Sequence, residues 1–296
     1  MKATVVINLH SKHAQRELAR IPELLAARNI EIVDFWKAEG NADLERRLRQ
    51  AREEDVEFLI AGGGDGTMTQ TANAFAYTDT TLGVLPLGTG NSFALTLGID
   101  GGLEGAVDVI ARERVVRVDL GFVNDRYFAN FATIGFAAEV AESTDRNLKL
   151  RIGALAYFVA AVRPFITHRG FRAKVCTKKR RFSVQTQQIL VVNGRFFGNR
   201  AIAQDASDTN GKLAFFTAAG GSRAEILKTY LAFALGVHDR LPEACAFSSK
   251  RIRIRTRPRQ PLNIDGDALG ETPARFSVAK RALRVLVPAN FIDYHK

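Results

Sequence analysis

The chain has 296 residues, of which 46% are apolar and 25% are charged, the balance of a globular protein of one or two domains. The nearest approach to a membrane span, residues 153–162, is about half of the ~20 residues required, and no signal-peptide pattern opens the sequence. The only cysteines, Cys176 and Cys245, lack Cys-x-x-Cys spacing, so we expect reduced thiols, no metal cluster and a cytoplasmic protein.

The formal net charge of +11 is open to three interpretations: nucleic-acid binding, attraction to an anionic membrane, or solubility alone. No spacing typical of a nucleic-acid-binding module occurs, so we expect no nucleic-acid partner. A basic surface gains roughly 1 kcal/mol per Lys or Arg near an anionic bilayer, which would serve an enzyme with a lipid substrate. A solvated basic surface is the simpler alternative.

The first part of the chain alternates strands and helices. The predicted strands are 4–9, 30–36, 56–61 and 82–87, and the predicted helices are 14–28, 41–52, 67–77, 91–97 and 102–112. Asn41 is the expected N-cap of the second helix. This order predicts a parallel sheet with helices on both faces.

Two glycine-rich turns follow the third and fourth predicted strands. Gly62–Thr67 reads GGGDGT, and Gly88–Ser92 reads GTGNS. Glycine lets a ligand approach the backbone closely, and N–H groups that open a helix favour an anion. Each turn alone is compatible with an ordinary strand-to-helix connection, and neither matches a P-loop or a Rossmann fingerprint. As a pair at neighbouring strand ends, they predict a phosphate site.

After residue 114 the predicted elements change from alternating strands and helices to mostly strands. This change predicts two domains, 1–114 and 115–296. The expected strands are 115–122, 126–132, 171–177, 182–193, 212–217, 250–257 and 282–287, with helices at roughly 137–162 and 222–237. Hairpin-type turns between these strands predict a second, mainly antiparallel β-rich domain. Alternating arginines from Arg251 to Arg259 share one strand face. That face is either an exposed face or edge blunted by charge, or a patch that faces a membrane.

The sequence GGDGT (Gly63–Thr67) followed by PLGTGN (Pro86–Asn91) resembles the catalytic domain shared by diacylglycerol kinases, sphingosine kinases and bacterial lipid kinases. NAD kinases and phosphofructokinases are similar at the first motif only. The resemblance implies ATP and Mg²⁺ as cofactors, and phosphorylation of a diacylglycerol-like lipid at an anionic membrane surface. It also allows a homodimer. A sphingoid-base or polyprenol kinase, or a catalytically weak lipid- or nucleotide-binding homologue, are the alternatives.

The resemblance places the nucleotide at three segments. Asn8 and Ser11 match the family's Asn-Pro-x-Ser-Gly loop, and Lys12 either adds a charge toward phosphate or is an exposed lysine at a helix start. The other expected nucleotide-binding residues are Gly63, Gly64, Asp65, Gly66, Thr67, Gly88, Thr89, Gly90 and Asn91.

Three aspartates are the expected catalytic acids. Asp65 either caps the helix that follows it or serves the metal and the phosphates. Asp119, in a Val-Asp-x-Gly strand, is implied to reach Mg²⁺ through water. Asp267 stands where the family has a glutamate general base, one methylene longer, although residues 265–267 also suit a hairpin turn. Residues 204–211 resemble a structural Mg²⁺ loop in which Asn210 replaces the expected aspartate.

Overall fold

The computed structural model describes residues 1–143, 163, 165–194, 196–197, 200–201, 209–220, 222, 224–225, 227–229, 232 and 244–294. Its contacts divide the chain into two compact units. Unit 1 comprises Met1–Leu120, Ser207–Gly211 and Ala279–Lys296, and unit 2 comprises Gly121–Ala206 and Lys212–Val278. The domain boundary expected from the sequence between residues 114 and 115 stays a prediction. The carboxyl-terminal residues group with unit 1 because Arg284 and Val285 pair with the fourth strand.

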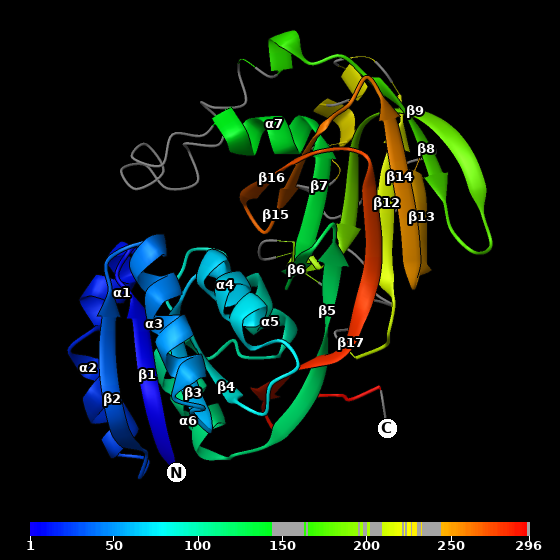
Figure 1. The fold of residues 1–296 in the computed structure, drawn as a ribbon. Coiled ribbons are helices and arrows are strands. Elements are labelled where there is room, and N and C mark those ends of the chain that lie inside the picture. Colours follow the sequence, from blue (N-terminus) through cyan, green and yellow to red (C-terminus); the bar gives the residue numbers. More distant parts are fainter. Residues whose placement is uncertain are drawn as a thin grey trace. The chain divides into compact units, whose positions relative to one another are not determined.

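Unit 1 contains a parallel sheet in the order β2-β1-β3-β4-β17 (Figure 1). The strands are β1 (Lys2–Asn8), β2 (Glu31–Ala38), β3 (Phe58–Gly63), β4 (Thr81–Pro86) and the end of β17 (Ala274–Leu286). Val5, Val6 and Ile7 are all fully buried, as expected of a parallel strand that is covered on both faces.

The helices of unit 1 cover both faces of this sheet. They are α1 (Lys12–Glu17), α2 (Arg20–Ala26), α3 (Asn41–Glu53), α4 (Asp65–Phe75), α5 (Ser92–Thr96) and α6 (Gly102–Ala111). The chain moves one way from β1 to β2 and the other way from β2 to β3, so right-handed crossovers place the connecting helices on opposite faces. Accordingly α3 contacts α4, whereas α2 contacts α6.

Two local predictions in unit 1 are wrong. The expected helix 14–28 is two helices, α1 and α2, because Pro22 lies in the first turn of α2, where the N–H that proline lacks would have no partner in the helix. Asn41 is the first residue of α3, and its N-cap is Gly40 at a φ of 108°. The carboxylate of Asp43, in the first turn of α3, accepts the backbone N–H of Glu39 at 3.0 Å and so ties the residue before the N-cap to the helix.

Unit 2 is an antiparallel β structure, as predicted. Its strands are β6 (Arg126–Phe128), β7 (Phe131–Gly135), β8 (Phe171–Cys176), β9 (Arg181–Val192), β10 (Phe196–Phe197), β11 (Arg200–Ala201), β12 (Leu213–Ala219), β13 (Ala244–Ser249), β14 (Arg251–Arg257), β15 (Pro261–Ile264) and β16 (Asp267–Glu271). β5 (Val115–Val123) and β17 have residues in both units. The helix α7 (Phe136–Ser143) begins the predicted helix 137–162, and most of that helix and of 222–237 lies outside the described residues.

Two features of unit 2 differ from expectation. The predicted strand 126–132 is interrupted between β6 and β7, because the N–H groups of Ala129 and Asn130 bind the carboxylate of Asp265. β14 is not an edge strand, since it pairs with β8 on one side and β17 on the other, but its arginine face is exposed, as one of the alternatives predicts. Its isoleucines, Ile252 and Ile254, are fully buried in the core with Phe171. No helix within the described ranges is both long and apolar enough to cross a bilayer.

Candidate functional site

The sheet of unit 1 reverses its strand order between β1 and β3. Such a switch point is where open α/β sheets bind ligands, at the carboxyl ends of the strands. Asn8 ends β1, and Thr67 lies in the first turn of α4, just after β3. The Asn8 Nδ2 donates a hydrogen bond to Thr67 Oγ1 at 3.0 Å, and both residues are buried. This bond ties together the two loops that border the switch point.

The two glycine turns pack directly against each other. A Cβ on Gly88 would lie 2.3 Å from the Cα of Gly64, so the turn after β4 has no space for a side chain at this position. A Cβ on Gly63 would lie 2.3 Å from Thr67 Oγ1. Close backbone packing therefore requires glycine at these positions, and it brings the turn after β3 into contact with the turn after β4.

Asp65 links the turns electrostatically. It is the first residue of α4, and its Oδ1 accepts the backbone N–H of Phe93 at 3.1 Å. Phe93 lies in the first turn of α5, so the carboxylate accepts a hydrogen bond at the start of the neighbouring helix. A Cβ on Gly90 would lie 3.0 Å from Asp65 Oδ2, which shows how closely the acid approaches the second turn.

Asn91 holds the second turn in shape. Its Oδ1 accepts the N–H of Gly88 at 2.8 Å, and its Nδ2 donates to the carbonyls of Gly88 and Pro86 at 3.1 and 3.3 Å. The residue is left-handed, with a φ of 51°, a conformation that asparagine tolerates better than most residues. Asn91 is therefore a positioning residue, whereas the neighbouring Thr89 is exposed.

The loop after β1 joins the same site. The Ser11 hydroxyl donates to the carbonyl of Leu87, just after β4, and accepts the N–H of Ala14 at 3.0 Å as the N-cap of α1. Lys12 is exposed, and its ammonium makes no ion pair with any residue that the structure describes. The structure thus brings together Asn8, Ser11, both glycine turns and Asp65.

These residues fit the phosphates of a nucleotide. The N-cap of α4, Gly64, has no side-chain hydrogen bond, and a Cβ on Gly66 would meet no atom within 4 Å. An uncapped helix N-terminus beside open space is a site for an anion. The Asp65 carboxylate would supply an oxygen ligand of the kind that Mg²⁺ prefers. No group of three His, Cys, Asp or Glu side chains that could hold a metal ion occurs within the described ranges.

Asp119 lies elsewhere in unit 1. It is 1% exposed, and its Oδ1 and Oδ2 accept the backbone N–H groups of Arg281 and Gly211 at 2.8 and 2.7 Å. The carboxylate therefore fastens residues 209–211, the end of the expected structural Mg²⁺ loop, to β5 and β17. Residues 202–208 of that loop lie outside the described residues. A link from Asp119 to Mg²⁺ through water stays a prediction.

Two aspartates of unit 2, Asp265 and Asp267, are close in the chain but differ in the contacts of their carboxylates. Asp265 is buried, and its carboxylate accepts the N–H groups of Ala129, Asn130 and Phe131 at 2.7, 3.1 and 2.8 Å. Asp265 and Gly266, at φ values of 48° and 100°, form the two-residue turn between β15 and β16, the hairpin alternative foreseen from the sequence. Sequence reasoning missed the anchoring role of Asp265, because nothing in the local sequence marks its distant partners.

Asp267 follows this turn as the first residue of β16 and is half-buried. Its carboxylate has no hydrogen-bond or ion-pair partner within the described part of the chain. The hairpin thus fixes the backbone of Asp267 while its side chain is not committed to a structural contact.

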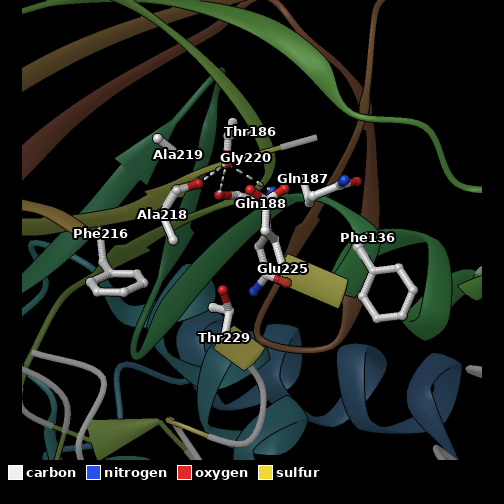
Figure 2. Close-up of a pocket in the computed structure, with 10 residues that line it drawn as sticks. All are labelled: Phe136, Thr186, Gln187, Gln188, Phe216, Ala218, Ala219, Gly220, Glu225 and Thr229. Atoms are coloured by element: carbon white, nitrogen blue, oxygen red, sulfur yellow. Dashed lines mark hydrogen bonds between the residues drawn. The ribbon is translucent and has the colours of Figure 1, made fainter. Parts of the chain in front are cut away.

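A pocket in unit 2 lies where β9 changes its neighbour from β8 to β7 (Figure 2). The residues that line it are Phe136, Thr186, Gln187, Gln188, Phe216, Ala218, Ala219, Gly220, Glu225 and Thr229. The space open to the centre of a water molecule is about 20 Å³, which suits one or two waters. This pocket is too small for a lipid chain in the conformation described.

Comparison with known proteins agrees with this architecture. The diacylglycerol kinase catalytic domain matches residues 2–123, and the YegS C-terminal NAD kinase beta sandwich-like domain matches residues 130–287. Diacylglycerol kinase of Staphylococcus haemolyticus is 29% identical over 86% of this chain and 78% of its own. That of Staphylococcus carnosus is 29% identical over 84% of this chain and 82% of its own.

Solved structures show the same fold. The crystal structure of a diacylglycerol kinase from Bacillus anthracis str. Sterne superposes with a TM-score of 0.75 at 19% identity, covering 98% of both chains. A second structure from that organism reaches a TM-score of 0.81 at 22% identity, over 98% of this chain and 96% of the other.

Most of the α/β unit falls within the first family match and most of the antiparallel β unit within the second. The chain belongs to the diacylglycerol kinase catalytic-domain family, a lipid kinase family.

Proposed function

We propose that the protein is an ATP-dependent lipid kinase that transfers the γ-phosphoryl group to the hydroxyl of a diacylglycerol-like lipid. The observation that carries this proposal is the locked pair of glycine turns at the switch point of the sheet, with Asp65 bonded across them to α5. In a chain of this family, that arrangement is the structure expected of a binding site for the triphosphate of ATP.

The residues of the chain have distinct tasks in this reaction. The backbone N–H groups of the α4 first turn bind phosphate oxygens, and the exposed Thr89 and Lys12 add a donor and a charge. Asp65 would hold Mg²⁺, which supplies charge neutralisation for phosphoryl transfer. Asp267 would accept the proton of the lipid hydroxyl, a role for which its uncommitted carboxylate is suited. The water-mediated metal role of Asp119 and the domain limits 1–114 and 115–296 belong to the same proposal.

The proposal also covers the cellular location and the binding partners of the enzyme. A lipid substrate and a net charge of +11 support a cytoplasmic protein that associates peripherally with an anionic membrane. We also propose that no nucleic acid is bound, and the family resemblance allows a homodimer.

Asp267 is one methylene shorter than the glutamate of the family, and this difference favours a second candidate function. A carboxylate displaced by one methylene, on the order of 1 Å, can cost ~100-fold in rate. The protein would then be a catalytically weak lipid- or nucleotide-binding homologue. Within kinases, a sphingoid base or a polyprenol is the alternative substrate, whereas we expect NAD not to be phosphorylated.

Transfer of labelled phosphate from ATP to a mixed lipid extract, with identification of the product, tests the proposal. Diacylglycerol, a sphingoid base, a polyprenol and NAD serve as separate acceptors. We expect Asp65→Asn and Asp267→Ala to lose on the order of 100-fold or more in kcat, and Asp267→Glu to equal or exceed the parent. Equal labelling by the parent, Asp65→Asn and Asp267→Ala would refute the assigned site. ATP binding without turnover in the folded parent would favour the weak homologue.

A further inference from the structure

The larger of the two hollows described in unit 2 is a basic groove, formed mainly by β8 and β14, which lie side by side (Figure 1). Its lining consists of Arg172, Lys174, Arg255, Thr256, Arg257, Arg259, Thr272 and Pro273. The space open to the centre of a water molecule is about 340 Å³, against about 20 Å³ for the pocket in Figure 2. A hollow of this size accepts a small ligand.

The strand register places the cations in a regular array. Arg255 faces Lys174 and Arg257 faces Arg172 across the antiparallel pair of β14 and β8. Directly opposite residues have Cβ atoms about 5 Å apart, and successive residues on one strand face are separated by about 6.6 Å. The two pairs therefore form a compact square of four positive charges, which Arg259 extends.

Nothing within the described ranges neutralises this array. The lining includes five cationic side chains and no Asp or Glu, and none of the five makes an ion pair with a described residue. Like charges directly opposite each other on a sheet destabilise it. Two adjacent pairs of this kind raise the free energy of the folded state unless an anion lies between them.

The wall of the groove is held in place. The Thr256 and Thr272 hydroxyls hydrogen-bond to each other at 2.5 Å, and the N–H of Gln260 donates to Thr272 Oγ1 at 3.0 Å. The N–H of Thr272 donates back to the Gln260 carbonyl at 2.9 Å. Thr256 and Thr272 are buried at 8% and 1% exposure. These bonds connect the segment that carries Arg257 and Arg259 to the facing loop, so the cations project from a fixed backbone.

We propose that this groove is a binding site for a multiply charged phosphate anion. The guanidinium groups present forked donors that match phosphate oxygens in pairs, and a bound phosphate would offset the repulsion between the facing cations. The ligand is either a free phosphate compound or the phosphate headgroup of a lipid, which share this chemistry. The inference does not rest on the proposed kinase activity, because all lining residues belong to unit 2, whereas the glycine turns belong to unit 1.

Two matched double variants of the full chain test the site. Arg255→Gln/Arg257→Gln removes two lining charges, and Arg251→Gln/Arg253→Gln removes two charges from the same face of the same strand outside the groove. Inorganic pyrophosphate, titrated calorimetrically, is the soluble probe. Phosphatidylcholine vesicles with and without phosphatidic acid, in a sedimentation assay, are the lipid probe.

We expect the parent and the Arg251/Arg253 control to bind one more pyrophosphate, or to bind phosphatidic acid vesicles more tightly, than the Arg255/Arg257 variant. The affinity of the Arg255/Arg257 variant for the phosphate probe at the groove should fall at least about tenfold, since a hydrogen bond to a charged group contributes ~1.5–3 kcal/mol. The parent and both double variants should all keep any pyrophosphate bound at the glycine turns. Binding there therefore cannot account for a difference between the variants. Loss of pyrophosphate binding alone assigns a free phosphate compound, and loss of vesicle binding alone assigns a lipid headgroup.

Thermal unfolding without any anion provides an independent measurement. The Arg255/Arg257 variant should be at least as stable as the parent, because it removes the repulsion between facing cations. Lys174→Gln, on the neighbouring strand, should show the same loss of anion binding if the double variant folds poorly. Equal weakening in both double variants would mean diffuse attraction and would overturn the site. So would unchanged binding of both probes by the Arg255/Arg257 variant.

Discussion

Gly64 and Gly88 lie backbone against backbone, so closely that a Cβ on Gly88 would be 2.3 Å from the Gly64 Cα. The two residues are on different turns, after β3 and β4, and their contact sets the spacing of the backbone groups on both turns. Glycine at position 88 is thus required by packing inside the protein, before any ligand is considered, whereas a Cβ on Gly64 would make a tight contact of 3.2 Å with the Gly88 Cα.

Gly88→Ala should separate the two turns. The added methyl group cannot fit without a backbone shift, so we expect a loss of about 1–3 kcal/mol in the free energy of unfolding and at least tenfold weaker ATP binding. Chemical denaturation and calorimetric ATP titration measure the two effects. Gly105→Ala is the control, since its Cβ would meet no atom within 4 Å in the interior of α6. It should gain about 0.5–1 kcal/mol without changing ATP affinity. A Gly88→Ala protein with the ATP affinity of the parent would contradict the positioning role.

Asn91→Gly isolates the side-chain contribution to the second turn. Glycine accepts the φ of 51° without strain, but removes the hydrogen bonds to Gly88 and Pro86. We expect a loss of about 1–3 kcal/mol in stability, and weaker ATP binding with an unchanged KM for the lipid. Steady-state kinetics with each substrate varied in turn separates these effects. An increase in the lipid KM alone would place Asn91 in the acceptor site instead.

Asp265 and Asp267 are two residues apart but should respond in opposite ways. Asp265→Asn weakens three hydrogen bonds from buried N–H groups to a carboxylate, so we expect a loss of about 2–3 kcal/mol in the free energy of unfolding. Asp267→Asn touches no described partner, so its stability should stay within about 0.5 kcal/mol of the parent, while kcat falls by at least 100-fold if it is the general base. Urea denaturation and single-turnover phosphoryl transfer measure these quantities. Retained turnover in folded Asp267→Asn would exclude it as the base.

Asp43 should make a small, pH-dependent contribution to stability. The hydrogen bond from Arg46, and then that from the Glu39 backbone, lower the pKa of this carboxyl below its ordinary value of 3.8. A lowered folded-state pKa stabilises the protein above the unfolded-state pKa, and that stabilisation is lost as the pH falls through the folded-state pKa. Asp43→Asn should therefore be less stable than the parent at neutral pH, by under about 1 kcal/mol because the pair is largely solvated. The difference should disappear in strongly acidic solution, as followed by thermal unfolding across pH. A constant difference at all pH values would point to packing instead of charge.

The sequence predicts most elements of both units because their hydrophobic periods are strong. The strand expected at 82–87 is observed at Thr81–Pro86, and the helix expected at 102–112 at Gly102–Ala111. The strands Pro261–Ile264 and Asp267–Glu271 were missed as strands, since they are short and follow no clear alternation. The break between β6 and β7 was missed because it depends on Asp265, more than 130 residues away in the chain.

In the candidate site, too, the local features could be predicted from the sequence and the contacts between distant segments could not. The motifs gave its location, since glycine runs after buried strands are local signals. They did not show that Asp65 accepts a hydrogen bond at the start of α5, that the amide of Asn91 is committed to its own turn, or that Thr67 is buried under Asn8. Each of these depends on a contact between segments that the sequence does not place in register.

Local composition, by itself, determined that this protein alternates strands and helices before it becomes β-rich, and that two glycine turns follow adjacent buried strands. Those features depend on residues close together in the chain, whose periodicity and backbone freedom can be read directly. The tertiary structure decided that Gly64 meets Gly88, that Asp119 binds the backbone of Gly211 and Arg281, and that Arg172 and Lys174 join the arginines of β14 in one groove. Strand pairing and packing bring those groups together, and they act over distances in the chain that no local pattern records.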